Sequence, residues 1–323
     1  MIASLFAPLA HHPAARGLQD DAALWVPHGA QVMTCDAIVE GVHFLPDDPL
    51  DTVAQKALRV NLSDLAAKGA KPDGALLSLI WPKRLSANDM ATFAAGLGVD
   101  LETYGIALLG GDMTTTPGPL TISIMAFGTP ANAREPAHVP ARADAKPGQQ
   151  VYVSGTIGDS VLGLMARQGA LPVDLPQDLV AYLVDRYRRP QPRLVLAPWL
   201  AAHAGASMDV SDGLIADARK LAAASGVRLA LAPHRVPLSP AANAALSAAA
   251  TDLPTLLAGG DDYEILFTID PGSEPSLCAY ANRVNLAVTH IGTVERGEGL
   301  SAELANGRDL GREPGGYVHR FCG

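Results

Sequence analysis

Short apolar runs alternate along the chain with longer segments in which apolar residues recur every three or four positions. Residues 31–41 (QVMTCDAIVEG) predict a strand that leads into a loop. Residues 51–70 (DTVAQKALRVNLSDLAAKGA) predict a helix, because their apolar residues share helical spacing. Gly69 and Pro72 should end that helix, since both residue types terminate helices. The chain therefore begins its pattern as a strand followed by a helix.

The same alternation continues through the next sixty residues. Residues 74–82 (GALLSLIWP) predict a strand, and residues 86–105 (SANDMATFAAGLGVDLETYG) predict a helix that starts at a serine and ends at a glycine. Residues 106–112 (IALLGGD) and 120–128 (LTISIMAFG) predict two strands around a glycine-rich turn. This half of the chain is thus expected to form a sheet with helices.

A stretch rich in proline, alanine and charge, residues 130–149, interrupts the pattern and is the best candidate for a domain boundary. After it, the alternation resumes through further segments: QVYVSG, DSVLGLMARQGA, LVLAPWLAAHAGA, ASMDVSDGL, IADARKLAAASG, VRLALA, YEILFTID and LAVTHIGTV. We predict two α/β or α+β domains, over residues 1–135 and 146–323. The pattern leaves open whether the strands are parallel or antiparallel.

Length and composition mainly exclude other classes of protein. At about 150 residues per domain, 323 residues agree with two domains. A net charge of −9 disfavours nucleic acid as a partner, and no apolar run reaches the roughly 18 residues of a membrane span. The three cysteines are too far apart to suggest a disulfide framework or a zinc motif. Because no basic segment precedes the first apolar run, we interpret the N-terminus as mature and expect a cytoplasmic protein.

The familiar catalytic and nucleotide-binding motifs are absent. The sequence contains no Walker A motif, no dinucleotide-binding glycine pattern after a strand, no nucleophile elbow and no metal-binding histidine spacing. Aspartates recur instead where strands end and helices start. They are Asp20, Asp21, Asp36, Asp64, Asp112, Asp209, Asp212, Asp261 and Asp262.

Each of these aspartates, taken singly, is more often a turn residue or a helix cap, and Asp212 is well placed to cap the helix that follows it. Taken together they favour another interpretation. Several carboxylates close to buried segments need cations, and few lysines or arginines lie nearby in the sequence. Hard oxygen ligands suit magnesium, and carboxylates that hold magnesium attract a nucleotide triphosphate instead of repelling it. The pattern therefore indicates metal-assisted phosphoryl transfer without a P-loop.

Eight segments of the chain occur in an order that resembles the thiamine-monophosphate kinase family. They are DDAAL, CDAIVEGVHF, KALRVNLSDLAAKGA, GGDMTT, AKPGQQVYVSGTIGDS, RPQPR, DVSDGLIAD and GGDDYEILFT. The resemblance covers nearly the whole chain. The wider superfamily includes aminoimidazole ribonucleotide synthetase, selenide, water dikinase and a hydrogenase maturation factor. It implies the two-domain fold of that synthetase, with an N-terminal α/β domain that pairs its sheet across a homodimer and a C-terminal α+β domain.

The resemblance also implies which residues form the site. The implied magnesium ligands are Asp21, Thr34, Cys35, Asp36, Asp64, Asp112, Asp209 and Asp212. The implied nucleotide contacts are Tyr104, Gly111, Asp112, Arg142 and Ser211, and the implied acceptor contacts are His43, Asp261 and Tyr317. Cys35 stands where the family usually has threonine; a ligand through the backbone carbonyl would be kept at this position, whereas a side-chain ligand would be altered. Asp261 stands where the family usually has glutamate.

The implied reaction transfers the γ-phosphate of ATP to thiamine phosphate and yields thiamine diphosphate, the last step in making that compound. The acceptor is a phosphate monoester that is already ionised at neutral pH, so we expect no general base and no phosphorylated enzyme. Two alternatives stay open: another ATP-dependent enzyme of the superfamily, and a non-catalytic divalent-ion-binding or regulatory protein with the same fold.

The loop at residues 258–267 (AGGDDYEILF) has an expected role in acceptor binding. Thiamine carries a permanent positive charge, and we expect the carboxylate of Asp261 to face it. The glycine pair, Gly259 and Gly260, should let the backbone approach the substrate closely. Asp262 and Glu264 are expected to anchor the turn and the following strand.

Overall fold

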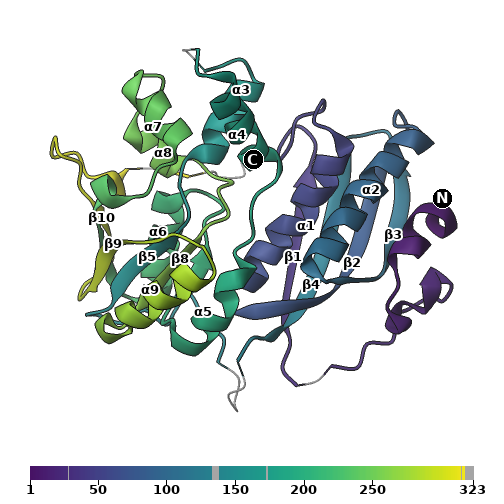
Figure 1. Cartoon of the computed structure of the whole chain (residues 1–323), viewed down its shortest axis with the longest axis horizontal. Helices are drawn as coiled ribbons and strands as arrows, with labels where there is room; N and C mark the ends of the chain where they lie inside the picture. Colours follow the sequence, from purple (N-terminus) through teal and green to yellow (C-terminus); the bar gives the residue numbers. More distant parts are fainter. Residues whose placement is uncertain (28, 133–137, 172–173, 314, 317–323) are drawn as a thin grey trace, which may run out of the picture.

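The computed structural model describes residues 1–323 except 28, 133–137, 172–173, 314 and 317–323. Two lobes lie side by side (Figure 1): the first comprises the sheet and helices before residue 133, and the second those after residue 137. The predicted boundary at residues 130–149 therefore lies where the chain passes from one lobe to the other.

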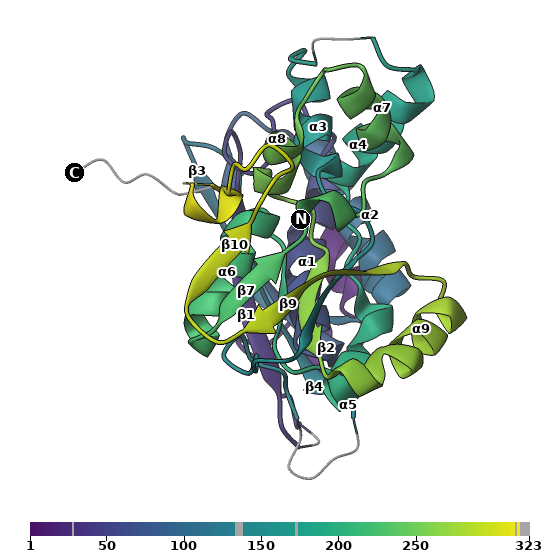
Figure 2. The ribbon, with the colours of Figure 1, turned by 90° about the vertical axis from the view of Figure 1, so that its left-hand side faces the viewer.

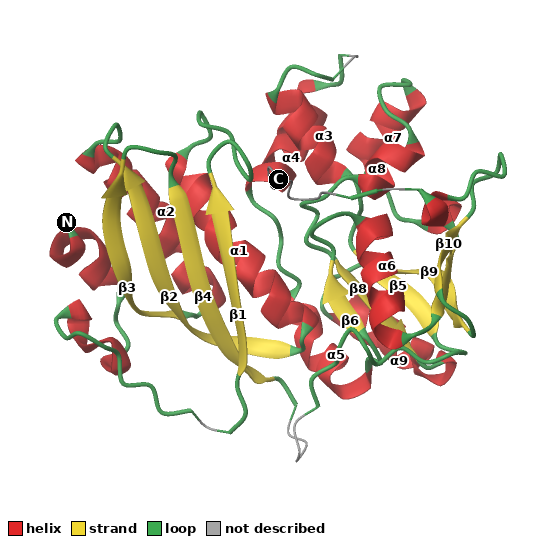
Figure 3. Cartoon of the chain, turned by 180° about the vertical axis from the view of Figure 1, so that it is seen from behind, coloured by secondary structure: helices red, strands yellow, loops and turns green. Residues whose placement is uncertain are grey.

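The first lobe is a four-stranded sheet with two long helices on one face (Figures 1 and 3). Its elements are β1 (Val32–Val39), α1 (Leu50–Ala67), β2 (Ala70–Pro82), α2 (Ala87–Tyr104), β3 (Ala107–Thr116) and β4 (Thr121–Pro130). The strand order is β1-β4-β2-β3. The β2–β3 pair is parallel, and the other two pairs are antiparallel. All the strands and helices predicted for this half are present.

The first glycine pair lies in a strand, as predicted. Gly110, Gly111 and Asp112 lie inside β3. The register between β2 and β3 shifts just before these residues. A Cβ atom added to Gly111 would lie only 1.8 Å from the carbonyl oxygen of Leu77 on β2. The glycine therefore permits a close approach of two strand backbones.

The helices begin and end where the sequence predicts. Ser86 and Asp89 form a reciprocal capping box at the start of α2, and Gly105 ends this helix with φ 62°. Helix α1 is buried on almost every side, because it packs against the sheet and also against the second lobe. Ala66 and Ala67, at its C-terminal end, join the apolar cluster of the second lobe around Trp199.

The second lobe contains a curved six-stranded sheet in the order β10-β7-β9-β5-β8-β6 (Figure 2). Its strands are β5 (Gln150–Ser154), β6 (Ser207–Asp209), β7 (Arg228–Leu231), β8 (Ile265–Ile269), β9 (Val288–Glu295) and β10 (Gly299–Ala302). Its helices are α3 (Asp159–Arg167), α4 (Gln177–Arg188), α5 (Ala197–His203), α6 (Leu214–Ser225), α7 (Pro240–Ser247), α8 (Leu253–Ala258) and α9 (Glu274–Arg283). Only the β10–β7 pair is parallel.

Short helical turns complete the structure. They are η1 (Ile2–Phe6), η2 (Ala7–Leu9), η3 (Pro13–Leu18), η4 (Leu194–Leu196), η5 (Pro233–Arg235), η6 (Pro271–Ser273) and η7 (Leu310–Arg312). Among the helices that the structure describes, none is both long and apolar enough to cross a membrane.

Candidate active site

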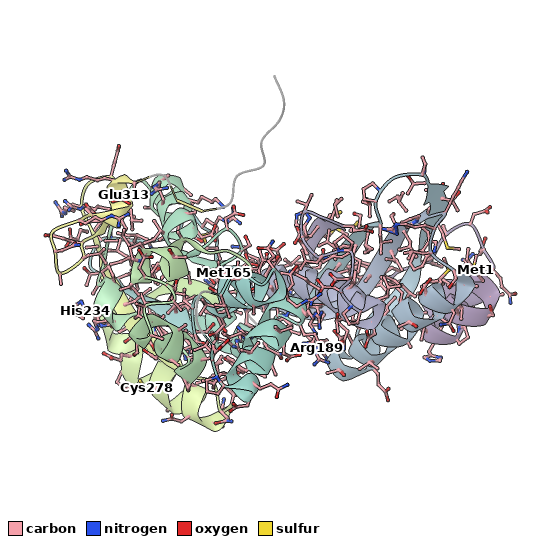
Figure 4. The ribbon with its side chains drawn as sticks, turned by 90° about the horizontal axis from the view of Figure 1, so that it is seen from above. Met1, Met165, Arg189, His234, Cys278 and Glu313 are labelled. Atoms are coloured by element: carbon pink, nitrogen blue, oxygen red, sulfur yellow. The ribbon has the colours of Figure 1, made fainter. Side chains whose placement is uncertain are left out.

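A cavity of about 380 Å³ lies between the two lobes and collects most of the residues singled out from the sequence. In Figure 4, Met165 marks the position of α3 beside the boundary between the lobes. Residues from the first turns of α3 form one apolar part of the wall. The predicted site residues that line the cavity are Asp36, His43 and Asp64 of the first lobe, and Arg142, Asp209, Ser211, Asp212 and Asp261 of the second.

Strand β1 and helix α1 together place the first acidic side chains. Alternate β1 residues Thr34 and Asp36 share one face of the strand, and the hydroxyl of Thr34 donates a hydrogen bond to Asp64 of α1. Asn61, one turn before Asp64 and fully buried, accepts the backbone N–H of Asp36 at 3.0 Å. The amide side chain thus ties the strand to the helix at the point where their carboxylates meet.

Burial and mutual repulsion raise the pKa values of these carboxylates. Burial, followed by the negative charge of Asp64, raises the pKa of Asp36 to about 6. The same two causes raise the pKa of Asp209, at the end of β6, to about 8. In the part of the chain that the structure describes, no ion pair joins Asp36, Asp64 or Asp209 to a basic side chain.

Lys68 interacts electrostatically with Asp64 and Asp209 but forms no ion pair with either of them. Lys68, at the end of α1, donates its ammonium hydrogens to the backbone carbonyls of Pro140 and Ser207. Burial, and then the positive charge of Arg142, lower the pKa of Lys68 to about 8. Asp36, Asp64 and Asp209 therefore remain without a direct basic partner among the described residues.

Hard divalent cations fit the chemistry of this cluster, because its donors are carboxylate and hydroxyl oxygens. The described side chains do not by themselves form a complete shell: among them, no group of three or more His, Cys, Asp or Glu side chains is arranged to hold a metal ion. Asp36, Asp64 and Asp209 are the members of the implied ligand set that lie in this cavity without a basic partner among the described residues.

The loop between β6 and α6 is held by a residue to which the sequence analysis gave no role. The buried carboxylate of Asp217 accepts the backbone N–H groups of Ser211 and Asp212, each at 2.9 Å. Lys220 pairs with both Asp217 and Asp212. The helix-capping interpretation of Asp212 is wrong, since Gly213 occupies the cap position and no side chain caps α6.

The wall of the cavity also contains His43 and the loop that leads into β8. The His43 ring accepts the backbone N–H of Val39 through Nδ1 at 3.0 Å. Asp261 has a left-handed backbone with φ 69°, and its carboxylate accepts a hydrogen bond from Lys56 at 2.8 Å. Lys56 is a further residue that the sequence analysis did not select.

Asp262 and Glu264 anchor this loop, as predicted. Asp262 accepts the backbone N–H groups of Gly158 and Ser160 at the start of α3. Burial raises the pKa of the Asp262 carboxyl to about 8. Glu264 is fully buried and pairs with Arg186 at 2.9 Å and also with Arg193.

The glycine pair also permits close packing within the protein. A Cβ atom on Gly260 would lie 2.5 Å from the carbonyl oxygen of Ser211, and one on Gly259 would lie 2.6 Å from side-chain atoms of Val161. The close approach that these glycines permit is therefore to neighbouring parts of the protein itself.

Several predicted site residues lie elsewhere. Asp21, Gly111 and Asp112 line a second cavity of about 940 Å³, in the first lobe, between the N-terminal segment and the sheet. Cys35 points to the sheet face opposite that of Asp36, is exposed, and has its Sγ atom 3.6 Å from the hydroxyl of Ser123.

Two further predicted residues are not in the cavity between the lobes. The Tyr104 ring lies 5.6 Å from the guanidinium carbon of Arg59 and packs against the apolar core of the first lobe. Tyr317 lies outside the described residues. The structure thus brings together eight of the predicted residues in the cavity, and Thr34 donates a hydrogen bond to one of these, Asp64.

Comparison with known proteins agrees with this geometry over both lobes. The family described as AIR synthase related protein, N-terminal domain, matches residues 19–129, and the corresponding C-terminal domain family matches residues 146–305. The thiamine-monophosphate kinase of Caulobacter vibrioides is 42% identical over 98% of this chain and 89% of its own length. The chain belongs to the thiamine-monophosphate kinase family.

Solved structures of this kinase family share the fold. The thiamine-monophosphate kinase of Stenotrophomonas maltophilia matches with a TM-score of 0.79 and 36% identity, over 88% of this chain and 89% of that one. A structure described as AaThiL complexed with AMPPCP and TMP matches with a TM-score of 0.78 and 32% identity, over 93% and 91% of the two chains.

The residues that the sequence analysis missed left signals in the sequence of this family member. Lys56 lies four residues before Val60, on the apolar face of the predicted helix, where a lysine needs a buried partner. Asp217 follows Asp212 within the quoted segment DVSDGLIAD, in the first turn of the helix, where a carboxylate is well placed to bind free N–H groups.

Proposed function

We propose that this chain catalyses the ATP-dependent phosphorylation of thiamine phosphate to thiamine diphosphate, with magnesium, as the last step in making that compound in the cytoplasm. The observation that carries the proposal is the cavity between the lobes. Its walls combine an unneutralised acidic cluster with His43 and the Asp261 loop. Family membership supports the same reaction, and the solved relative bound to AMPPCP and TMP accommodates both kinds of ligand.

The residues of the cavity have distinct parts in this proposal. Asp36, Asp64 and Asp209 hold magnesium, and bound magnesium supplies positive charge that offsets the charge of the transferring phosphate. Arg142 contributes a fixed cation on the cavity wall. Asp217 fixes the backbone of Ser211, which contacts the nucleotide. These residues act by positioning and by electrostatics, which dominate phosphoryl transfer.

The proposal includes direct, in-line transfer without a catalytic base. The acceptor phosphate has a second pKa near 6, so it is largely ionised at neutral pH and needs no proton removed. The cavity-lining phenols do not supply a ready base, since burial raises the pKa of Tyr187 and that of Tyr263. Incubation with labelled ATP in the absence of acceptor should leave the protein unlabelled. A phosphorylated protein would contradict direct transfer.

A homodimer is part of the proposal, with the sheet of the first lobe facing a second subunit. Asp21, Gly111 and Asp112 lie away from the cavity between the lobes, at a largely apolar hollow against this sheet. Pairing of two such faces would cover the hollow and bring its acidic residues close to a shared site. The proposed domains are residues 1–135 and 146–323. Measurement of the solution mass tests the dimer, and a mass of one chain would contradict it.

A single assay distinguishes this reaction from the alternatives. ATP consumption is measured with thiamine phosphate, with the precursor of aminoimidazole ribonucleotide, and without acceptor. Consumption that thiamine phosphate alone stimulates, with thiamine diphosphate as product, is expected. Stimulation by the other acceptor would indicate another activity of the superfamily, and no stimulation by either would favour a non-catalytic role.

A further inference from the structure

Lys56 carries a buried ammonium group directly behind the cavity wall that His43 and Asp261 form. Its side chain is 2% exposed, and it is among the largest fully buried side chains of the described residues. A buried ammonium is strongly unfavourable unless partners replace its lost water. The partners of Lys56 must therefore account for its place on α1.

Three cavity-lining residues surround this ammonium group. Its Nζ atom donates hydrogen bonds to Asp261 Oδ2 and to the backbone carbonyl of His43, both at 2.8 Å. It also lies 4.2 Å from the centre of the Tyr187 ring, a favourable distance for a cation–π interaction. These partners belong to the loop after β1, to α4 and to the loop before β8. Lys56 thus joins both lobes at one point of the cavity.

The conformation of the Asp261 loop requires such support. Asp261 and Tyr263 both have left-handed backbones, with φ 69° and 51°, which is uncommon for residues other than glycine. Strained conformations of this kind persist where the surrounding structure holds them. The backbone N–H of Asp261 donates to the carbonyl of Ser211 at 2.8 Å, and Lys56 holds the side chain.

We propose that Lys56 is a positioning residue for the phosphate acceptor, which acts through Asp261 and the backbone of His43. This inference rests on the proposed function, because it concerns binding of thiamine phosphate. Lys56 does not itself line the cavity, whereas the Asp261 side chain is 29% exposed there. Asp261 therefore presents to the acceptor a carboxylate that is oriented and partly neutralised by Lys56, instead of an isolated negative charge.

Arg59, on the next turn of the same helix, provides a matched control. It is also a buried cation, and it donates to Asp100 at 2.6 Å and to the backbone carbonyl of Pro190 at 3.2 Å. Its guanidinium carbon lies 5.6 Å from the centre of the Tyr104 ring. The environment of Arg59 thus repeats that of Lys56, but none of its partners lines the cavity.

The first experiment compares Lys56→Met with Arg59→Met by the Michaelis constants for thiamine phosphate and ATP and by the melting temperature. Lys56→Met should raise the constant for thiamine phosphate about tenfold or more, the usual effect of losing a hydrogen bond to a charged group, and change that for ATP less than about twofold. Arg59→Met should lower the melting temperature at least as much, yet leave both constants unchanged. An unchanged constant for thiamine phosphate in Lys56→Met, or an equal increase in Arg59→Met, would overturn the inference.

The second experiment tests whether Lys56 acts through Asp261, and it does not depend on Lys56→Met folding alone. Asp261→Asn is compared with the double variant Lys56→Met/Asp261→Asn, in which neither side chain leaves an unpaired buried charge. The two should have Michaelis constants for thiamine phosphate within about twofold of each other, because the shared interaction is already lost. A further increase as large as that of Lys56→Met in the wild type would overturn the inference. A wild-type chain without thiamine-phosphate turnover would instead reject the proposed function, and the inference with it.

Discussion

Two groups of carboxylates lie at or next to the cavity between the lobes, and the two groups differ in how their charges are neutralised. On the loop before β8, Asp261 pairs with Lys56, and Glu264 pairs with two arginines. By contrast, Asp36, Asp64 and Asp209 have no such partner among the described residues, and the pKa values of Asp36 and Asp209 are raised. Similar acidic residues in the sequence therefore differ in the structure: one group is paired with basic residues of the protein, and the other is not.

The largest effect is expected when one charge is removed from the carboxylates that have no basic partner. Asp64→Asn should reduce kcat by at least about a hundredfold, because loss of a metal ligand exceeds the 10–100-fold effect typical of outer partners. The fold should remain, since the substitution removes repulsion from a neighbouring carboxylate. Steady-state kinetics and the melting temperature measure the two effects. Exposed Asp178, in the first turn of α4, provides the control Asp178→Asn, which should keep normal turnover. Near-normal activity of Asp64→Asn would remove Asp64 from the metal site.

Among the carboxylates that form ion pairs with basic residues, removal of one should act mainly on the stability of the fold. Glu264→Gln leaves the guanidinium groups of Arg186 and Arg193 without their buried counter-charge. Breaking a buried ion pair in this way costs about 3–5 kcal/mol in the free energy of unfolding. Urea unfolding measures the loss. A change below about 1 kcal/mol would show that the segment leading into β8 is not held by these ion pairs.

The pH dependence of stability should further distinguish the unpaired carboxylates from the paired ones. The folded-state pKa of Asp36, about 6, lies above the ordinary value of 3.8, so the folded protein binds this proton more tightly than the unfolded chain. Without magnesium, stability from this group is present below about pH 4 and is lost as the pH rises to about 6, by on the order of 3 kcal/mol. Asp209 should extend the loss toward pH 8.

Magnesium should reverse this loss, because it binds the ionised carboxylates. The increase in melting temperature on adding magnesium should therefore be larger at pH 8 than at pH 5.5, and Asp36→Asn should diminish the difference. An equal increase at both pH values would argue against metal binding at these raised-pKa carboxylates.

The smallest effect is expected at Cys35. Its side chain lies on the sheet face opposite that of Asp36. Cys35→Ser should therefore change kcat by less than about twofold, and any role of this residue in metal binding would lie with its backbone. Loss of activity in Cys35→Ser, measured in the same kinetic assay with magnesium in excess, would show that the side chain takes part.

Local patterns predicted much of the fold. The apolar spacing of α1 and the serine and glycine at the ends of α2 sufficed, because neighbouring residues determine these features. The strand pairing was not predictable, since it depends on contacts between distant segments. The need for glycine at position 111 has the same origin: it accommodates the backbone of Leu77, a residue more than thirty positions away.

The candidate site likewise contains residues that local sequence pointed to and residues that only the fold reveals. Asp36, Asp64 and Asp209 were found because acidic residues next to apolar segments are unusual. Lys56 was missed because its partner Asp261 lies about two hundred residues later in the chain. A family pattern identifies residues at a site, but only the fold shows which charges already have partners inside the protein.

The most direct test of this account is the formation of thiamine diphosphate from thiamine phosphate and ATP, followed by chromatography while magnesium is titrated after complete chelation. The account predicts no product without magnesium, a rate that rises and saturates as magnesium is restored, and little or no product from Asp64→Asn at any magnesium concentration. Equal product formation with and without magnesium, or from Asp64→Asn and the wild type, would contradict the claim that the unpaired carboxylates hold the metal for this transfer.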